Sequence, residues 1–141
     1  MSWSLLESDP AVFTDLMTAV GVKGLQLEEV YSLDDISPLT SGLFFLFKWK
    51  KGRAPDPVSH DDDPDAPIFL QQVIPNACGT LALLHVLLNC PGLDIGDVLG
   101  QFRDFVRFLP SEDRGTALGA ESLPRRLLGH PPPAVFFYRQ L

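Results

Sequence analysis

Hydrophobic side chains near the start of the chain recur at the spacing of a helix. In "SDPAVFTDLMTAVGVKG" the apolar residues after Pro10 fall three and four positions apart, and Ser8 or Asp9 precedes them as a candidate N-cap. Proline at the first helical position fits such a start, because its missing N–H would have no helical partner there. The pattern predicts a helix that begins near Pro10 and ends at Gly21 or Gly24.

Two further helices are predicted in the middle of the chain. "GTLALLHVLLNC" is apolar on nearly every side until Pro91 and Gly92 stop it, which predicts a buried helix over residues 78–90. "LDIGDVLGQFRDFVRFL", residues 93–109, places apolar residues at helical spacing and charged residues on the other face. This second pattern predicts an amphipathic helix.

Shorter apolar stretches predict strands. "LQLEEV", residues 25–30, partly alternates and indicates a short strand, whereas "GLFFLFKWK", residues 42–50, is continuous and rich in aromatic residues. A continuous apolar run of that length is typical of a strand that is buried on both faces. Residues 42–50 are therefore the stronger strand candidate.

Two segments lack the pattern of a packed element. Residues 52–67, "GRAPDPVSHDDDPDAP", hold four prolines and five aspartates but no large apolar residue beyond Val58, so we expect a flexible acidic insertion on the surface. From residue 110 onward glycine, proline and small residues recur and the periodicity decays. We assign residues 121–141 to a divergent tail with room for one strand at most.

Length and charge narrow the class of protein. The 141 residues suit one domain or part of a larger one, and 45% hydrophobic with 21% charged residues is a globular composition. The net charge of −7, without a long run of Lys or Arg, disfavours direct nucleic-acid binding. No apolar stretch reaches the roughly 18 residues that cross a bilayer, and the amino terminus lacks the regions of a secretory signal. We expect no membrane association and a reducing compartment.

The chain offers little for a metal or a nucleotide. Cys78 and Cys90 are twelve residues apart and have no matching His or Cys pair, which fits neither a zinc module nor a disulfide framework. "GVKG" lacks the spacing of either glycine-rich phosphate loop. We expect no metal and no cofactor.

Cys78 opens the predicted buried helix and has two interpretations. At the first turn a cysteine faces unpaired N–H groups and the positive end of the helix dipole, which both stabilise a thiolate nucleophile. Gln72, six residues upstream and across the turn at Pro75 and Asn76, is placed to donate an amide N–H to an oxyanion beside the sulfur. The alternative is an inert, packed cysteine in a plain α/β domain, because free cysteines are often buried.

Longer stretches around Cys78 resemble the ubiquitin carboxyl-terminal hydrolases, which are papain-like thiol deubiquitinases. "FLQQVIPNACGTLALLHVLLNC" is similar to the family's nucleophile segment, and "ESDPAVFTDLM", "GVKGLQLEEVYSLDD", "GLFFLFKWK" and "RGTALG" are similar to its amino-terminal blocks in the same order. The resemblance covers residues 3–120. It implies an α/β (α+β) fold with a central sheet wrapped by helices, in which residues 1–120 form the amino-terminal part of the catalytic domain.

The resemblance also implies an activity and partners. The family cleaves after the terminal glycine of ubiquitin, so ubiquitin or a ubiquitinated protein is the expected partner. "IPNAC", "GVKG" and the acidic insertion resemble the nuclear branch typified by Calypso and the BRCA-associated deubiquitinase. That likeness implies chromatin substrates, a nuclear and cytoplasmic location, and an Asx-like Polycomb partner for the full-length parent.

By the same resemblance Cys78 is the nucleophile, Gln72 stabilises the oxyanion and Cys90 packs at the end of the same helix. The family's general-base histidine and orienting aspartate lie in later motifs similar to A-F-H-F-V-S-Y and L-F-E-L-D-G, and neither motif is present. "PAVFFYRQL" aligns with the first motif only by placing Phe136 at the histidine. We therefore expect a fold truncated before the later strands, from a fragment, a splice form or an incomplete gene model. The alternative function is a catalytically incompetent form that at most binds ubiquitin or a partner.

None of the three histidines is a good substitute for the missing base. His85 is seven residues beyond Cys78, which is about 10 Å along a helix axis. His60 lies in the acidic insertion and His130 precedes a proline run, so neither is expected to have the fixed position that catalysis requires.

Overall fold

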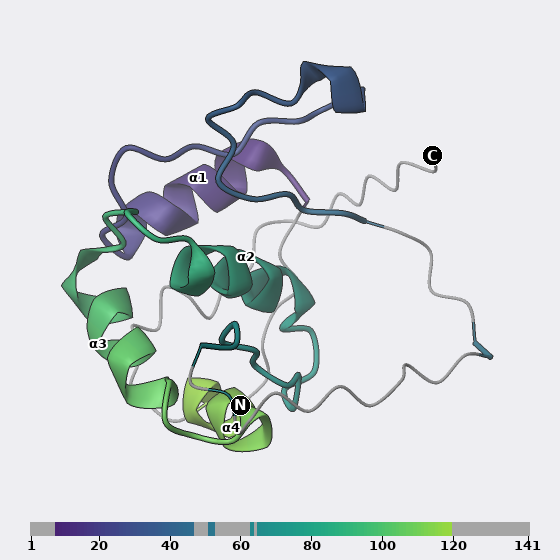
Figure 1. Ribbon diagram of the computed structural model, residues 1–141. Helices are drawn as coiled ribbons and strands as arrows, with labels where there is room; N and C mark the ends of the chain where they lie inside the picture. The colour runs from purple at the N-terminus through teal and green to yellow at the C-terminus, as the bar shows by residue number, and fades with distance from the viewer. Residues whose placement is uncertain (1–7, 47–50, 53–62, 64, 120–141) are drawn as a thin grey trace.

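The regular structure is helical in the part of the chain that the computed structural model describes, which is residues 8–46, 51–52, 63 and 65–119. In chain order the elements are α1 (Pro10–Ala19), the short 3-10 helix η1 (Leu33–Asp35), α2 (Cys78–Asn89), α3 (Gly96–Val106) and α4 (Ser111–Gly119). Figure 1 shows α2 at the centre, with α1 above it and α3 and α4 below. Most of the expected acidic insertion and the tail at 121–141 lie outside the described residues, as do His60 and His130.

The first helix begins as the sequence predicts. The Asp9 carboxylate caps it by accepting a hydrogen bond from the backbone N–H of Ala11 at 2.7 Å, and Pro10 occupies the first helical position. The apolar residues at helical spacing are buried in the core, as expected: these are Phe13, Leu16, Met17 and Val20.

The two central helices are confirmed as well. α2 buries its leucines almost completely, so it forms the centre of the core, and α3 packs against it through Leu99, Phe102 and Val106. The prediction for α3 holds only in part, because Phe105 has the helical spacing of an apolar face and yet is 57% exposed. Within the described residues, no helix is long and apolar enough to cross a membrane.

α4 is a helix that the sequence pattern did not predict. Its glycines and small residues make it a weak helix former, and contacts with other elements hold it in place. The buried Arg114 donates from Nε to the carbonyl of Val106 at 2.9 Å and from Nη2 to that of Arg107 at 3.3 Å, which caps the end of α3. Acidic residues in the first turn, Glu112 and Asp113, were the one available signal for its start.

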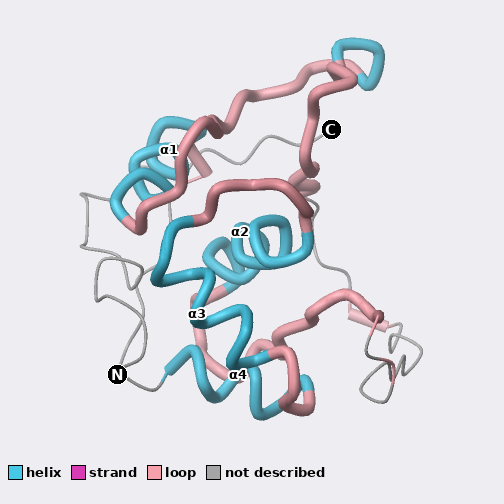
Figure 2. The backbone as a smooth tube through the Cα atoms, turned by 60° about the vertical axis from the view of Figure 1, so that its left-hand side comes forward, coloured by secondary structure: helices cyan, strands magenta, loops and turns pink. Residues whose placement is uncertain are grey.

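The two predicted strands are not formed in the described residues. Residues 25–30 are irregular, and the Leu27 N–H bonds to the Thr14 hydroxyl on α1 at 3.1 Å instead of to a neighbouring strand. Residues 42–46 do not form a strand, and 47–50 lie outside the described part (Figure 2). A strand needs a neighbour to bond with, and the only β-type pairing among the described residues is an isolated antiparallel bridge between Lys23 and Asp94.

The segment 42–46 is held by α1 and α2 through close contacts. A side chain at Gly42 would lie 2.6 Å from Val86 of α2, so the backbone there passes directly over the helix. Phe44 stacks on Phe13 of α1 with ring centroids 5.6 Å apart. Leu43 and Leu46 remain 56% and 64% exposed, so the expectation of a strand buried on both faces is wrong for this part of the chain.

Candidate active site

Cys78 is the first residue of α2 and is exposed to solvent. The helix starts on the carbonyl of Ala77, which accepts the Leu81 N–H at 2.8 Å, and Ala77 offers no side chain to cap the first turn. The backbone N–H groups of the first turn therefore have no hydrogen-bond acceptor in the side chain of residue 77. They lie at the end of the helix that carries the Cys78 sulfur. The predicted position of Cys78 at a helix start is confirmed.

A sharp turn brings the chain into α2. Asn76 has a φ of 64°, a left-handed conformation that asparagine tolerates better than most residues, and Ala77 is completely buried. The turn reverses the chain, so the residues before it run back along α2. This reversal places Gln72 and Cys78 on the two sides of one turn.

Gln72 is exposed, and its side chain is held within this turn. Its amide Nε2 donates to the carbonyl of Ile74 at 3.2 Å. The N–H group expected to face an oxyanion therefore has a local acceptor in this structure.

Side chains of α2 hold the backbone that leads to Gln72. The Asn89 side chain bonds both backbone groups of Ile68, as a neighbouring strand would. Its Oδ1 accepts the Ile68 N–H at 2.6 Å, and its Nδ2 donates to the Ile68 carbonyl at 2.9 Å. One turn earlier on the helix, Nε2 of His85 accepts the Leu70 N–H at 2.9 Å. Residues 68 and 70 are thus bonded to α2 although no strand lies there.

α4 holds the other edge of the same segment. The Gln71 N–H donates to the carbonyl of Ser111 at 3.1 Å. A Cβ atom at Gly115 would lie only 1.9 Å from the Gln71 carbonyl oxygen, so only glycine allows this approach. Together, α2 and α4 clamp the segment from both sides just before Gln72.

His85 is a structural acceptor rather than a candidate base. Its ring stacks on Phe69 with centroids 5.0 Å apart, and burial lowers its pKa below the ordinary value of 6.5 because the charged imidazolium loses solvation. Its Nε2 is already engaged with the Leu70 backbone. The expectation that His85 does not serve Cys78 is consistent with this geometry.

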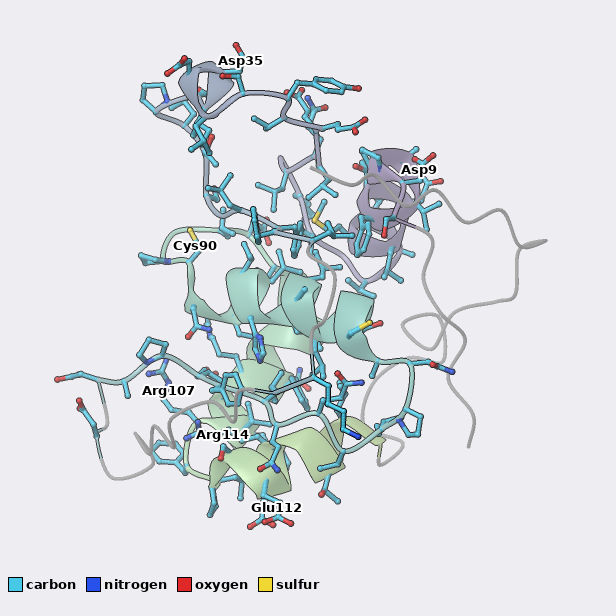
Figure 3. All side chains as sticks on the ribbon, turned by 90° about the vertical axis from the view of Figure 1, so that its right-hand side faces the viewer. Asp9, Asp35, Cys90, Arg107, Glu112 and Arg114 are labelled. Atoms are coloured by element: carbon cyan, nitrogen blue, oxygen red, sulfur yellow. The ribbon has the colours of Figure 1, made fainter. Side chains whose placement is uncertain are left out.

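Cys90 lies at the opposite end of α2 from Cys78, where it follows the last helical residue. It is half-buried rather than fully buried as expected, and its Sγ lies 3.9 Å from the carbonyl of Pro91. Figure 3 shows Cys90 above α2 and the pair Arg107 and Arg114 below it. No group of three metal-ligating side chains occurs among the described residues.

Sequence reasoning did not single out His85 and Asn89 as supports of the site. The available signal was the pair of polar residues, four positions apart, in the otherwise apolar "LLHVLLN". That spacing puts both side chains on one face of the helix. Their hydrogen-bond partners became evident only once the position of residues 68–70 was known.

Known proteins resemble this chain over most of its length. Residues 3–127 match the family described as "Ubiquitin carboxyl-terminal hydrolase, family 1". The chain is 48% identical over 125 residues to ubiquitin carboxyl-terminal hydrolase 2 of Schizosaccharomyces pombe, covering 84% of this chain and 42% of the relative. It is 41% identical over 128 residues to ubiquitin carboxyl-terminal hydrolase BAP1 of Gallus gallus, covering 83% and 18%. The chain thus spans less than half the length of these curated relatives.

A solved structure shares the fold. Trichinella spiralis UCH37 bound to ubiquitin vinyl methyl ester matches with a TM-score of 0.68 and 37% identity, covering 89% of this chain and 50% of that one. The fold class that the family resemblance implied is therefore confirmed. The described residues supply the helical part of that fold.

Proposed function

Because the chain belongs to family 1 of the ubiquitin carboxyl-terminal hydrolases, which are cysteine-type deubiquitinases, we propose that it supplies the nucleophile-bearing part of such a domain. Cys78 is the nucleophile and Gln72 the oxyanion stabiliser. One observation carries this assignment: an exposed thiol lies on the first residue of a buried helix, directly after the turn that separates it from Gln72.

The chemistry follows from this position. The Cys78 thiolate attacks the carbonyl carbon of ubiquitin's terminal glycine, and a C–S bond forms while the carbonyl oxygen gains the negative charge. Gln72 releases the Ile74 carbonyl and donates its N–H to that oxygen. The oxyanion then collapses to a thioester as the amine of the substrate takes up a proton and leaves, and water hydrolyses the thioester.

Turnover needs a proton acceptor and donor that the described residues do not supply. His85 is bonded to the Leu70 backbone, and neither family motif for the histidine or the aspartate occurs in the 141 residues. We therefore separate two steps of the reaction. Addition of Cys78 to an activated ubiquitin carboxyl terminus that has no amine leaving group requires only this part of the domain, whereas cleavage of an amide and rapid release require the imidazole as well.

The wider role follows from the family and its relatives. We assign residues 1–120 to the amino-terminal part of the catalytic domain, with the insertion at 52–67 and a divergent tail at 121–141. Ubiquitin or a ubiquitinated protein is the proposed substrate. For a full-length protein we propose chromatin substrates and an Asx-like Polycomb partner, on the resemblance of "IPNAC", "GVKG" and the acidic insertion to the nuclear branch of the family. The nucleus and cytoplasm are the proposed locations.

The direct test is covalent labelling of the purified chain with ubiquitin vinyl methyl ester at neutral pH. We expect one adduct with the wild type and with Cys90→Ala, and none with Cys78→Ala. Both substitutions remove a thiol, so the Cys90→Ala variant controls for nonspecific cysteine chemistry. Equal labelling of the wild type and both variants, or labelling lost only in Cys90→Ala, would refute the assignment of the nucleophile.

The second candidate function is binding without catalysis, which the missing histidine and aspartate motifs favour. Isothermal titration of Cys78→Ala with ubiquitin separates the two. Binding by the variant, together with no labelling of the wild type, would favour a ubiquitin-binding form. Labelling of the wild type favours the nucleophile assignment.

A further inference from the structure

His85 and Asn89 form two rungs that join α2 to the segment carrying Gln72. Four residues along a helix advance about 6 Å, and two residues along an extended chain advance about 7 Å. The spacing of the pairs Asn89 with Ile68 and His85 with Leu70 is therefore the same on the helix and on the segment, in agreement with the hydrogen bond that each pair makes. The rungs run antiparallel, since the residue number rises along the segment while it falls along the helix.

The spacing of these rungs, extended by one step, predicts the position of Gln72. By extrapolation Gln72 comes opposite Leu81, and Cys78 lies three residues, or about 4.5 Å, further along the helix axis. Catalytic groups must be held within a fraction of an ångström of their working positions. The hydrogen bond between His85 and Leu70 is the rung closest to Gln72, so it has the most direct effect on the position of the Gln72 backbone.

We propose that His85 is a positioning residue for Gln72: its unprotonated Nε2 accepts the Leu70 N–H and fixes the register of the oxyanion segment against the helix that carries Cys78. This inference rests on the proposed function for its catalytic meaning. The hydrogen bond itself does not depend on it.

The proton state of His85 decides whether this rung exists. A ring nitrogen accepts an N–H only while it carries no proton, so an imidazolium cannot hold Leu70. The two elements that contact the ring bring no charge that would favour the imidazolium: α2 and residues 68–74 contain no Asp, Glu, Lys or Arg. The charged groups on the helices packed around them are Asp97, Arg103 and Asp104 on α3 and Glu112, Asp113 and Arg114 on α4. The rung should open as the pH falls.

Two substitutions separate the effect of the hydrogen-bond acceptor at residue 85 from that of the aromatic ring. His85→Gln places an amide oxygen near the position of Nε2 and cannot titrate, whereas His85→Phe keeps the aromatic contact with Phe69 but offers no acceptor. We expect amide hydrogen exchange at Leu70 to rise about tenfold in His85→Phe and to stay near wild type in His85→Gln. Exchange at Leu99 in α3 should not change in either variant. Equal exchange at Leu70 in all three proteins would overturn the proposal.

Nuclear magnetic resonance tests the proton state directly. Long-range ¹H–¹⁵N spectra should show the Nδ1–H tautomer of His85 at neutral pH, and the Leu70 amide shift should titrate together with the ring in the wild type only. An Nε2–H tautomer would contradict the proposal. His130→Gln serves as the control that removes another histidine of the chain.

Transfer of ubiquitin from a ubiquitin thioester to Cys78 tests the link to Gln72, because this transfer passes through a tetrahedral oxyanion. His85→Phe should lower the transfer rate about tenfold, His85→Gln should restore it and flatten its fall below pH 6.5, and His85→Phe should have no further effect in a Gln72→Ala background. Additive effects of the two substitutions would show that His85 does not act through Gln72. Absence of transfer in every protein would refute the proposed function of the chain, while the exchange and tautomer data would still decide the role of His85.

Discussion

At the scale of single residues, Gln72 has a neighbour that makes a matched control. Both glutamines are exposed, but the Gln71 contacts that hold the segment come from its backbone N–H and carbonyl, whereas Gln72 uses its side-chain amide. We expect Gln72→Ala to lower the rate of ubiquitin transfer from a ubiquitin thioester to Cys78 about 100-fold, because this transfer passes through a tetrahedral oxyanion and the variant lacks one donor to it. Gln71→Ala should stay within about twofold of wild type. Equal losses would indicate a general disturbance of the segment.

His85 gives the chain a pH-dependent stability whose sign follows from burial. The folded ring has a pKa below 6.5, so between that lower pKa and 6.5 the unfolded chain binds more protons than the folded one. The free energy of unfolding is therefore at its full value above pH 6.5 and falls as the pH drops through the folded pKa. Urea denaturation at pH 7.5 and 5.5 should show a smaller fall for His85→Gln than for the wild type. An identical fall would contradict a buried, neutral His85.

At the scale of elements, the packing of α4 depends on one glycine. A methyl group at Gly115 would collide with the Gln71 carbonyl oxygen, while one at Gly100 on α3 would meet nothing within 4 Å. We expect Gly115→Ala to destabilise the chain by about 1–3 kcal/mol through overpacking. Gly100→Ala should stabilise it by about 0.5–1 kcal/mol through helix propensity. Urea denaturation measures both, and a neutral Gly115→Ala would mean that α4 does not approach Gln71 this closely.

The helices show how far the sequence determines the fold. α1, α2 and α3 can be predicted from the spacing of their apolar residues, from a proline or from a cap, because their buried faces consist of residues three and four positions apart. α4 does not, since its place depends on the buried guanidinium of Arg114 and on the absence of a side chain at Gly115. The residues predicted as strands lack neighbours to pair with in the described chain, and no local pattern can supply a missing neighbour.

The candidate site, like the helices, could be predicted from the sequence only in part. The sequence placed Cys78 at a helix start because an apolar run begins there, and the structure agrees. The local bond between Gln72 and Ile74, and the rungs from His85 and Asn89, depend on distances across the turn. Those distances follow from tertiary packing rather than from spacing in the chain.

At the scale of the whole molecule, exposed apolar residues set its behaviour in solution. Leu43 and Leu46 belong to an extended segment with no ladder partner in the described residues, which makes it a site for pairing between chains. We expect Leu46→Lys to reduce concentration-dependent association in sedimentation velocity experiments. Leu33→Lys makes the same change at a residue that is 81% exposed on η1, away from the segment, and should reduce association less. Equal effects would point to net charge as the cause.

The proposed role of the molecule requires that the Cys78 thiol react with an electrophile at the carboxyl terminus of a bound ubiquitin. Mass spectrometry of the chain after treatment with ubiquitin vinyl methyl ester, with and without excess free ubiquitin, locates the adduct and tests this dependence. We predict a single adduct on the peptide that contains Cys78, formed more slowly when free ubiquitin competes. An adduct on Cys90, or a rate at Cys78 that free ubiquitin does not change, would contradict a ubiquitin-directed nucleophile at the start of α2.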